Sequence, residues 1–159
     1  MTCRILLTIS AATLWVATAA AQSETPKVVE PAPKAGVEVS VGAVLANNRG
    51  DEFDHRLAAM RRQFDSFFTY SSYRLIEEQR KRIEWGGKAG FDIPGGRYVL
   101  VMPREFKNQH VVMKVVVIDG SHPIVDTTVA LRDRGTFLVG GQRQADGILI
   151  VAIGAQRVP

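Results

Sequence analysis

The sequence predicts a single α+β domain, in which one N-terminal strand and one amphipathic helix precede a mainly antiparallel β-meander of about six to seven strands. Two observations predict this fold class. Apolar residues recur at helical spacing near the start of the domain, whereas most later segments are apolar runs of strand length. Between those runs, turn sequences rich in glycine, proline and aspartate recur about every 8–12 residues, as they do in antiparallel meanders.

The first 21 residues have the three-part layout of a cleavable secretory signal peptide. Arg4 precedes an uninterrupted apolar run from Ile5 to Ala21, and the small residues Ala19 and Ala21 suit the −3 and −1 positions of a cleavage site. An uncleaved membrane anchor is the alternative, but the run is at the short end of the roughly 20 apolar residues that a span requires. We therefore expect export and cleavage near Ala21, which leaves the protein in the periplasm or outside the cell.

Cleavage would also remove Cys3, the only cysteine of the chain. The mature protein would then hold no disulfide, no zinc-thiolate site and no cysteine nucleophile, so its stability must come from a packed core. The formal net charge of the whole chain is +4. A balance this modest argues weakly for acidic partners, such as anionic lipid or polysaccharide, and gives no support to a dedicated nucleic-acid binder, so no nucleic-acid partner is expected.

A linker is expected next, over residues 22–36. Pro26, Pro31 and Pro33 are spaced through small and charged residues, a composition that cannot bury enough apolar area to offset the entropy of ordering. We expect this segment to be disordered and partly extended. The single folded α+β domain is then expected over residues 37–156.

The domain begins with a strand and a helix. Residues 37–41 alternate apolar and polar side chains, as a half-buried strand does. Asp51 is a suitable N-cap for a helix over residues 52–67. Its apolar residues fall at steps of three and four, which places them on one stripe: Phe53, Leu57, Met60, Phe64 and Phe67.

Residues 70–85 are compatible with two structures. Tyr70 and Tyr73 favour a strand, and Ile83 and Trp85 alternate like one, whereas residues 75–82 have high helix propensity. The strand-rich remainder of the domain favours one long, half-exposed strand, and the sequence leaves the choice open.

Six further strands are expected after residue 89. Pro103 is expected to end the second of them, and Gly140 and Gly141 are expected to separate the last two. Residues 111–118 are apolar almost without interruption, which is typical of a central strand. The six strands are expected over residues 91–93, 98–102, 111–118, 124–131, 136–139 and 148–153.

Residue types that carry catalysis are present without the required patterns. His55, His110 and His122 are far apart in the sequence, whereas metal ligands recur at short spacing or converge. Asp119, Ser121 and His122 are the residue types of a hydrolase triad, but three near neighbours in one turn rarely meet as a triad does. Hydrogen bonds to their own backbone are the expected role of these three residues.

Two shorter patterns also lack the arrangement that their chemistry requires. Glu77 and Glu78 are adjacent, so they point in different directions, and paired acid–base work needs carboxylates that converge. Gly86, Gly87 and Lys88 lack the spacing and the helix of a phosphate-binding loop. The sequence therefore predicts no catalytic residue, no metal ligand and no cofactor.

One segment combines positive charge with aromatic residues, a combination that can bind polyanions or sugars. The alternative is a solvated strand face that Glu77, Glu78 and Glu84 neutralise. The possible binding surface consists of Tyr70, Tyr73, Arg80, Lys81, Arg82 and Trp85.

Residues 125–141 contain a strand–turn–strand pattern that ends in a glycine pair. The positions that carry the pattern, in order, are Thr127, Val129, Leu131, Asp133, Thr136, Gly140 and Gly141. The pattern resembles a stretch of the C-terminal β-domain of secretins, the outer-membrane rings of secretion systems and type IV pili, with Arg134 inserted and no match after Gly141. The mature chain also resembles small exported bacterial proteins of unassigned function. These resemblances imply an envelope protein with a related β-hairpin.

We therefore expect a non-enzymatic, exported envelope protein that acts by association, in an assembly or accessory role in the periplasm or outer membrane. Exposed sheet edges would offer pairing to an envelope partner or to a second copy. One alternative is a periplasmic module that binds a polyanion, such as anionic lipid or polysaccharide, or another glycan. A periplasmic hydrolase whose site cannot be recognised from the sequence is the other.

Overall fold

The computed structural model describes residues 35–144 and 146–159, so the predicted signal peptide and nearly all of the predicted linker lie outside the described residues. The described part is β-rich and consists mainly of antiparallel strands with one short helical segment, as the sequence predicts. Its strands are β1 (Gly36–Asn47), β2 (Ser72–Glu84), β3 (Ala89–Ile93), β4 (Arg97–Lys107), β5 (His110–Asp119), β6 (His122–Arg132), β7 (Gly135–Gln144) and β8 (Gly147–Val158).

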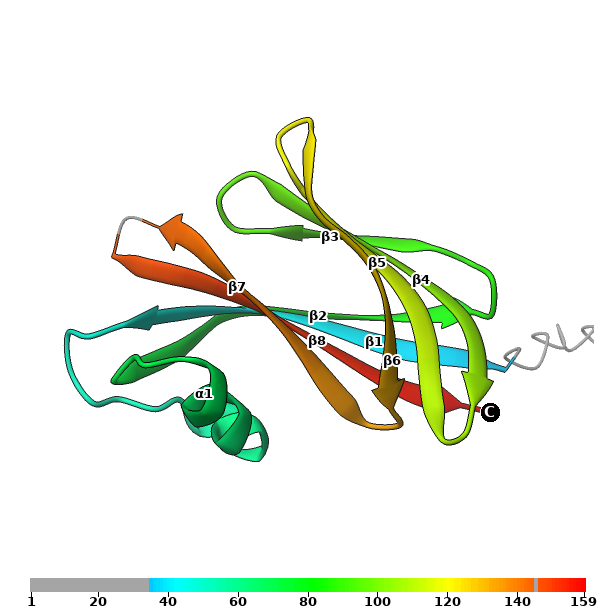
Figure 1. Cartoon of the computed structure of the whole chain (residues 1–159), viewed down its shortest axis with the longest axis horizontal. Helices are drawn as coiled ribbons and strands as arrows, with labels where there is room; N and C mark the ends of the chain where they lie inside the picture. Colours follow the sequence, from blue (N-terminus) through cyan, green and yellow to red (C-terminus); the bar gives the residue numbers. More distant parts are fainter. Residues whose placement is uncertain (1–34, 145) are drawn as a thin grey trace, which may run out of the picture. The chain divides into compact units, whose positions relative to one another are not determined.

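The eight strands of the described part form two four-stranded antiparallel sheets. The strand order is β2-β1-β8-β7 in sheet A and β3-β4-β5-β6 in sheet B. Strands that follow one another in the chain are neighbours within each sheet, and the connections from β2 to β3 and from β6 to β7 pass between the sheets. Because β8 returns beside β1, the path is a cyclic meander. Figure 1 shows sheet B on one side of sheet A and helix α1 (Arg61–Phe67) on the other.

The main core lies between the two sheets. Alternate residues of β1 and β8 point into it from sheet A, and alternate residues of β4 and β5 meet them from sheet B. Val39, Val101, Met113 and Ile153 are fully buried there. Burial of one such side chain contributes roughly 1.5–3 kcal/mol. Side chains of β6 and β7 are only partly buried against this core, so the sandwich is least covered along that edge.

A second, smaller core lies between the outer face of sheet A and the helical segment. Leu57 and Phe64 from the helical segment are fully buried against Val44, Tyr73 and Ile150 of the sheet. Aromatic rings dominate the contact, because the Phe64 and Tyr73 ring centroids are 5.0 Å apart. One face of sheet A is therefore covered by sheet B, and part of its other face is covered by the helical segment.

A β-bulge at Ile76 allows β2 to serve both cores. Consecutive residues of β1 pair with Leu75 and Glu77, so Ile76 is the extra residue. Because of the extra residue, odd-numbered residues of β2 before Ile76 face the helical segment, whereas odd-numbered residues after it face the main core. Leu75 consequently packs under the helical segment, whereas Ile83 points into the main core.

The helical segment differs from the single helix predicted over residues 52–67. It begins as the 3₁₀ helix η1 (His55–Met60) and continues as α1. Asp54 caps it in place of the predicted Asp51, since the Asp54 carboxylate accepts a hydrogen bond from the Arg56 backbone N–H at 3.0 Å. A 3₁₀ helix has about three residues per turn, against about 3.6 in an α-helix, so the apolar stripe changes direction. Phe67 is 74% exposed as a result, whereas Phe64 is 0% exposed.

Two strands continue through residues that were predicted to end them. Pro103 lies inside β4, beyond Val101, the last residue that pairs with β3. On the edge of β4 that faces β3, no strand of the described residues pairs with Pro103, so the missing N–H of proline costs no hydrogen bond between strands. The Pro103 carbonyl accepts a hydrogen bond from the Gly86 N–H at 2.9 Å. Gly140 and Gly141 lie in a bulge inside β7 and do not separate two strands.

We predict that Gly140→Ala lowers the free energy of unfolding by about 1–3 kcal/mol, the usual cost of overpacking. A Cβ atom at this position would lie 2.7 Å from Cζ of Phe68, so the ring would have to leave its place beside the second core. Urea unfolding followed by circular dichroism measures the change. In a Phe68→Leu background the same substitution should cost clearly less, and an equal cost in both backgrounds would show that the ring is not the cause.

Candidate interaction surface

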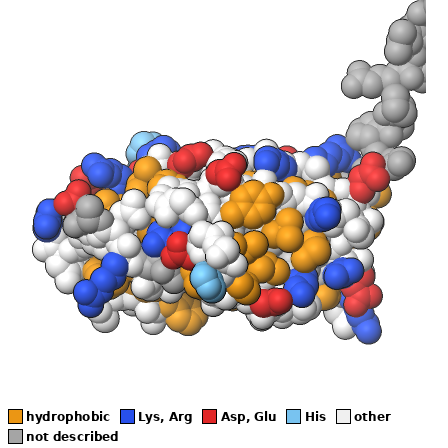
Figure 2. Space-filling view, turned by 90° about the horizontal axis from the view of Figure 1, so that it is seen from above, with side chains coloured by type: hydrophobic (Ala, Val, Ile, Leu, Met, Phe, Trp, Pro, Cys, Tyr) orange, Lys and Arg blue, Asp and Glu red, His pale blue; other side chains and the backbone are white. Residues whose placement is uncertain are grey.

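The outer face of sheet B carries apolar side chains on which no helical segment of the described residues packs. These side chains alternate with the core residues along β4 and β5, and Tyr98 among them is 38% exposed. Figure 2, a view from above, shows hydrophobic side chains gathered in a patch with charged side chains around it. We name the following residues the apolar face: Tyr98, Leu100, Met102, Val112, Val116 and Ile118.

Cross-strand pairing holds the apolar face together. Tyr98 pairs with Ile118 and Leu100 with Val116, so large side chains of adjacent strands lie side by side. Gly90 of β3 makes room for the aromatic ring, because a Cβ atom there would overlap the Tyr98 hydroxyl. The apolar face therefore extends across the two adjacent strands β4 and β5.

Charged side chains of both signs lie on and around the apolar face, and one of them, Lys114, lies between Val112 and Val116 of β5, opposite Met102. Lys114 Nζ and Asp126 Oδ1 lie 3.2 Å apart across β5 and β6. Asp92 of β3 pairs with Tyr98, which places a second carboxylate on the same side of the sheet. Arg132 of β6 is exposed at the far end. Apolar side chains with charges of both signs beside them are compatible with a protein interface.

The three aromatic residues of the predicted binding surface lie against the two cores. Tyr73 is 2% exposed in the second core, Tyr70 packs beside it, and Trp85 is partly buried against the main core. The Tyr70 backbone N–H donates to the Tyr73 hydroxyl at 3.3 Å. Burial raises the pKa of the Tyr73 phenol.

The three cations of that prediction lie on two faces of β2, because side chains alternate along a strand. Lys81 lies 4.9 Å from the centroid of the Phe91 ring and donates to the Gly90 carbonyl. Arg82 donates to the carbonyl of Pro159. Arg80 is paired with Glu78 at 3.0 Å and borders two cavities on the outer face of sheet A. The binding hypothesis stays a prediction, and the geometry places Arg80 where a ligand could reach it.

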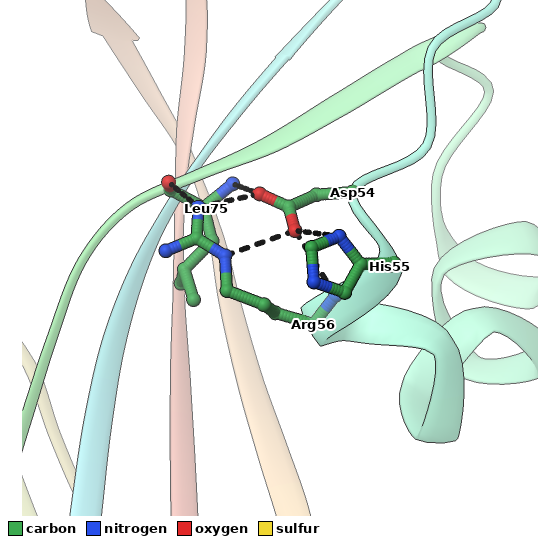
Figure 3. A network of polar contacts seen from close by, with 4 residues as sticks. All are labelled: Asp54, His55, Arg56 and Leu75. Carbon is green, nitrogen blue, oxygen red and sulfur yellow. Dashed lines mark hydrogen bonds and ion pairs between the residues drawn. The ribbon is translucent and has the colours of Figure 1, made fainter.

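The Asp54 carboxylate fastens the helical segment to sheet A, as Figure 3 shows. Its Oδ1 accepts the backbone N–H and Nε of Arg56, both at 3.0 Å, and its Oδ2 accepts Nη2 of Arg56 at 2.6 Å and the Leu75 N–H at 3.2 Å. The Arg56 side-chain hydrogen bonds in particular hold the pKa of Asp54 well below its usual range. Four accepted hydrogen bonds saturate a carboxylate, so Asp54 has a structural role.

Asp119, Ser121 and His122 do not form the hydrogen-bonded chain of a hydrolase triad. Ser121 Oγ and His122 Nδ1 are 3.4 Å apart, but the Asp119 carboxylate pairs with Arg97 Nε at 3.2 Å instead of with the histidine. Glu77 and Glu78 each accept a hydrogen bond from a neighbour on β2. Within residues 35–144 and 146–159, no group of three or more His, Cys, Asp or Glu could hold a metal ion.

Among the described residues, no helical segment has the length and the hydropathy that a membrane crossing requires. Within the part of the chain that the structure describes, two antiparallel sheets pack on each other, and the helical segment lies on the outer face of sheet A and not on that of sheet B. Comparisons of the chain with protein-family models, with curated proteins and with solved structures find no significant match. The function must therefore be inferred from the surfaces of this chain.

Proposed function

We propose that this is an exported, non-enzymatic envelope protein that acts by protein association, and that the apolar face of sheet B is the surface through which it associates. The difference between the two sheets carries the proposal. Leu57 and Phe64 of the helical segment cover part of the outer face of sheet A, whereas no helical segment of the described residues covers the matching face of sheet B, on which Tyr98 is 38% exposed. The signal-like start of the sequence supports export.

The energetics favour an occupied apolar face. Each Å² of apolar surface removed from water contributes about 25 cal/mol, so a partner that covers several large side chains gains appreciably. Monomeric proteins rarely keep a large contiguous apolar patch exposed unless it has a binding role. Tyr98, at 38% exposure, has the aromatic character typical of interface centres.

A second copy of this chain is the occupant that the surface fits best. Lys114 and Asp126 place both signs of charge on the same face, beside its apolar centre. A two-fold axis that lies in the plane of the contact and passes between these two side chains sets each cation opposite the partner's carboxylate, which is the self-complementarity that a symmetric dimer needs. Association would then bury two apolar faces against each other in a symmetric sheet-on-sheet contact.

We predict that the protein dimerises and that Leu100→Glu weakens the dimer at least about ten-fold, because two carboxylates would be buried near the two-fold axis. Sedimentation equilibrium over micromolar to millimolar protein measures the dissociation constant. Ile76→Glu is the matched control, since Ile76 is an exposed apolar strand residue, 43% exposed, on β2 and outside the apolar face. A wild-type chain that stays monomeric throughout, or an equal loss in the control, would overturn the assignment.

A further inference from the structure

A polar trough runs along the part of the outer face of sheet A that the helical segment leaves open. It consists of two adjoining cavities of about 440 and 210 Å³. Four residues line both cavities and make them continuous: Ser40, Arg80, Thr136 and Gly154. The larger cavity alone lies within the roughly 300–1,000 Å³ range of small-molecule sites. The trough is on the opposite side of the sandwich from the apolar face.

The depth of the trough comes from small residues on the two central strands of sheet A. Gly42 of β1 and Ala152 and Gly154 of β8 form its floor. A Cβ atom on Gly154 would lie 2.5 Å from Ser40 Oγ, so a larger residue there would fill the cavity or displace the hydroxyl. A ligand can therefore lie close to the sheet.

Three arginines from three different elements reach the trough. Arg56 comes from η1, Arg80 from β2 and Arg134 from the turn between β6 and β7. Arg56 and Arg80 are held by Asp54 and Glu78, at 2.6 and 3.0 Å, and are thereby oriented before any ligand arrives. Guanidinium groups bind carboxylates and phosphates through paired hydrogen bonds.

Of these three arginines, Arg134 has the fewest hydrogen bonds and ion pairs through its side chain. Its backbone N–H donates to the Ala155 carbonyl at 2.9 Å, which fixes the turn, and its φ of 63° lies in the left-handed region. Its guanidinium makes no hydrogen bond or ion pair with any residue in the described ranges. A long side chain kept at a strained backbone position beside a cavity is available to a ligand.

Hydroxyl groups complete the lining. Ser40 and Thr136 face the cavities from β1 and β7, and within the part of the chain that the structure describes neither hydroxyl is hydrogen-bonded. Each can donate one hydrogen bond and accept two. Glu38 and Glu78 add acceptors along the same trough. The lining therefore offers both donors and acceptors to a ligand rich in hydroxyl groups, and the guanidinium of Arg134 is available to a negative charge on that ligand.

From this lining we propose that the trough binds a short acidic saccharide, with its carboxylate held between Arg80 and Arg134 and its hydroxyls on Ser40 and Thr136. An inorganic anion would leave most of the larger cavity empty, and a neutral sugar would leave the guanidinium of Arg134 without a partner. This activity is separate from association through the apolar face.

Isothermal titration calorimetry at about 0.15 M salt, where exposed long-range charge effects are screened, tests the proposal with three probes. Trigalacturonate supplies acid and hydroxyl groups, maltotriose supplies hydroxyls alone, and inorganic phosphate supplies charge alone. Trigalacturonate should bind saturably, and neither of the others should match it. Absence of trigalacturonate binding, or equal binding of phosphate, would overturn the assignment.

Variants locate the site. Arg80→Gln should weaken trigalacturonate binding about ten-fold or more, and so should Arg134→Asn, since each removes a charge-assisted contact. Asparagine is chosen because it tolerates a positive φ. Arg104→Gln, on sheet B, and Leu100→Glu, on the apolar face, should bind as the unmodified protein does. A loss in Arg104→Gln as large as in Arg80→Gln would show attraction by overall charge and would refute the trough.

Discussion

Phe64→Ala is expected to lower the free energy of unfolding by about 3–5 kcal/mol, the usual cost of truncating a fully buried phenylalanine. The Phe64 side chain is 0% exposed and lies at the centre of the second core. Its ring centroid is 6.2 Å from those of Phe53 and Phe68 and 5.0 Å from that of Tyr73. Its removal would leave a cavity between the helical segment and sheet A.

Phe67→Ala is the matched control, because it removes the same side chain from the same helix at a position that is 74% exposed. A surface substitution of this kind usually changes stability by no more than about 0.5 kcal/mol. Urea unfolding of both variants, followed by circular dichroism, gives the comparison. If the two substitutions cost the same, the helical segment is not packed on sheet A through Phe64.

This pair of phenylalanines also shows how far the sequence could predict the helix. The spacing of Phe64 and Phe67 assigns both to one apolar stripe, and the structure buries only the first. A contact distant in sequence explains the difference. Phe53 forms a bridge with Tyr73 of β2, and the Asp54 N–H donates to the Tyr73 carbonyl at 2.9 Å. Residues 52–54 are thereby held in the sheet, and the helix starts later and in 3₁₀ form, which periodicity cannot reveal.

The apolar face could have been recognised from a pattern in the sequence. The run of apolar residues 111–118 predicts a central strand, and β5 is an inner strand of sheet B. A strand that is apolar on both sides needs two covered faces. Val115 and Val117 point into the main core, whereas Val116 and Ile118 belong to the apolar face. The sequence indicates that the second side is to be covered, but it cannot identify what covers it.

The trough could not be predicted from the sequence. Its lining comes from η1, β1, β2, β7 and β8, and the meeting of these elements depends on strand register and on the bulge at Ile76. The positively charged segment of β2 predicted a binding surface, and within it Arg80 reaches the trough. Arg134, Ser40 and Thr136 carry no local signal, because each is an ordinary turn or strand residue until the fold brings it beside Arg80.

Asp54→Ala is expected to lower the free energy of unfolding at neutral pH by about 2–3 kcal/mol, since it removes a helix N-cap together with hydrogen bonds to a charged group. Without the carboxylate, the Leu75 N–H and the Arg56 backbone N–H lose their acceptor. Asp54→Asn should cost less, because an amide oxygen can still cap the helix. Asp51→Ala, an exposed aspartate three residues earlier, serves as the control and should change little.

The same carboxylate should make stability depend on pH in a defined direction. The hydrogen bonds from Arg56 hold the pKa of Asp54 in the folded state well below its usual range, whereas in the unfolded chain it titrates near its ordinary value of about 4. Below that value the unfolded state takes up a proton that the folded state does not, so the stabilisation present above pH about 5 is lost progressively as the pH falls. The stability difference between the unmodified protein and Asp54→Ala, measured by urea unfolding from pH 7 to pH 3, should therefore shrink as the pH decreases. A difference that stays constant over this range would show that the Asp54 charge does not contribute to the attachment of the helical segment.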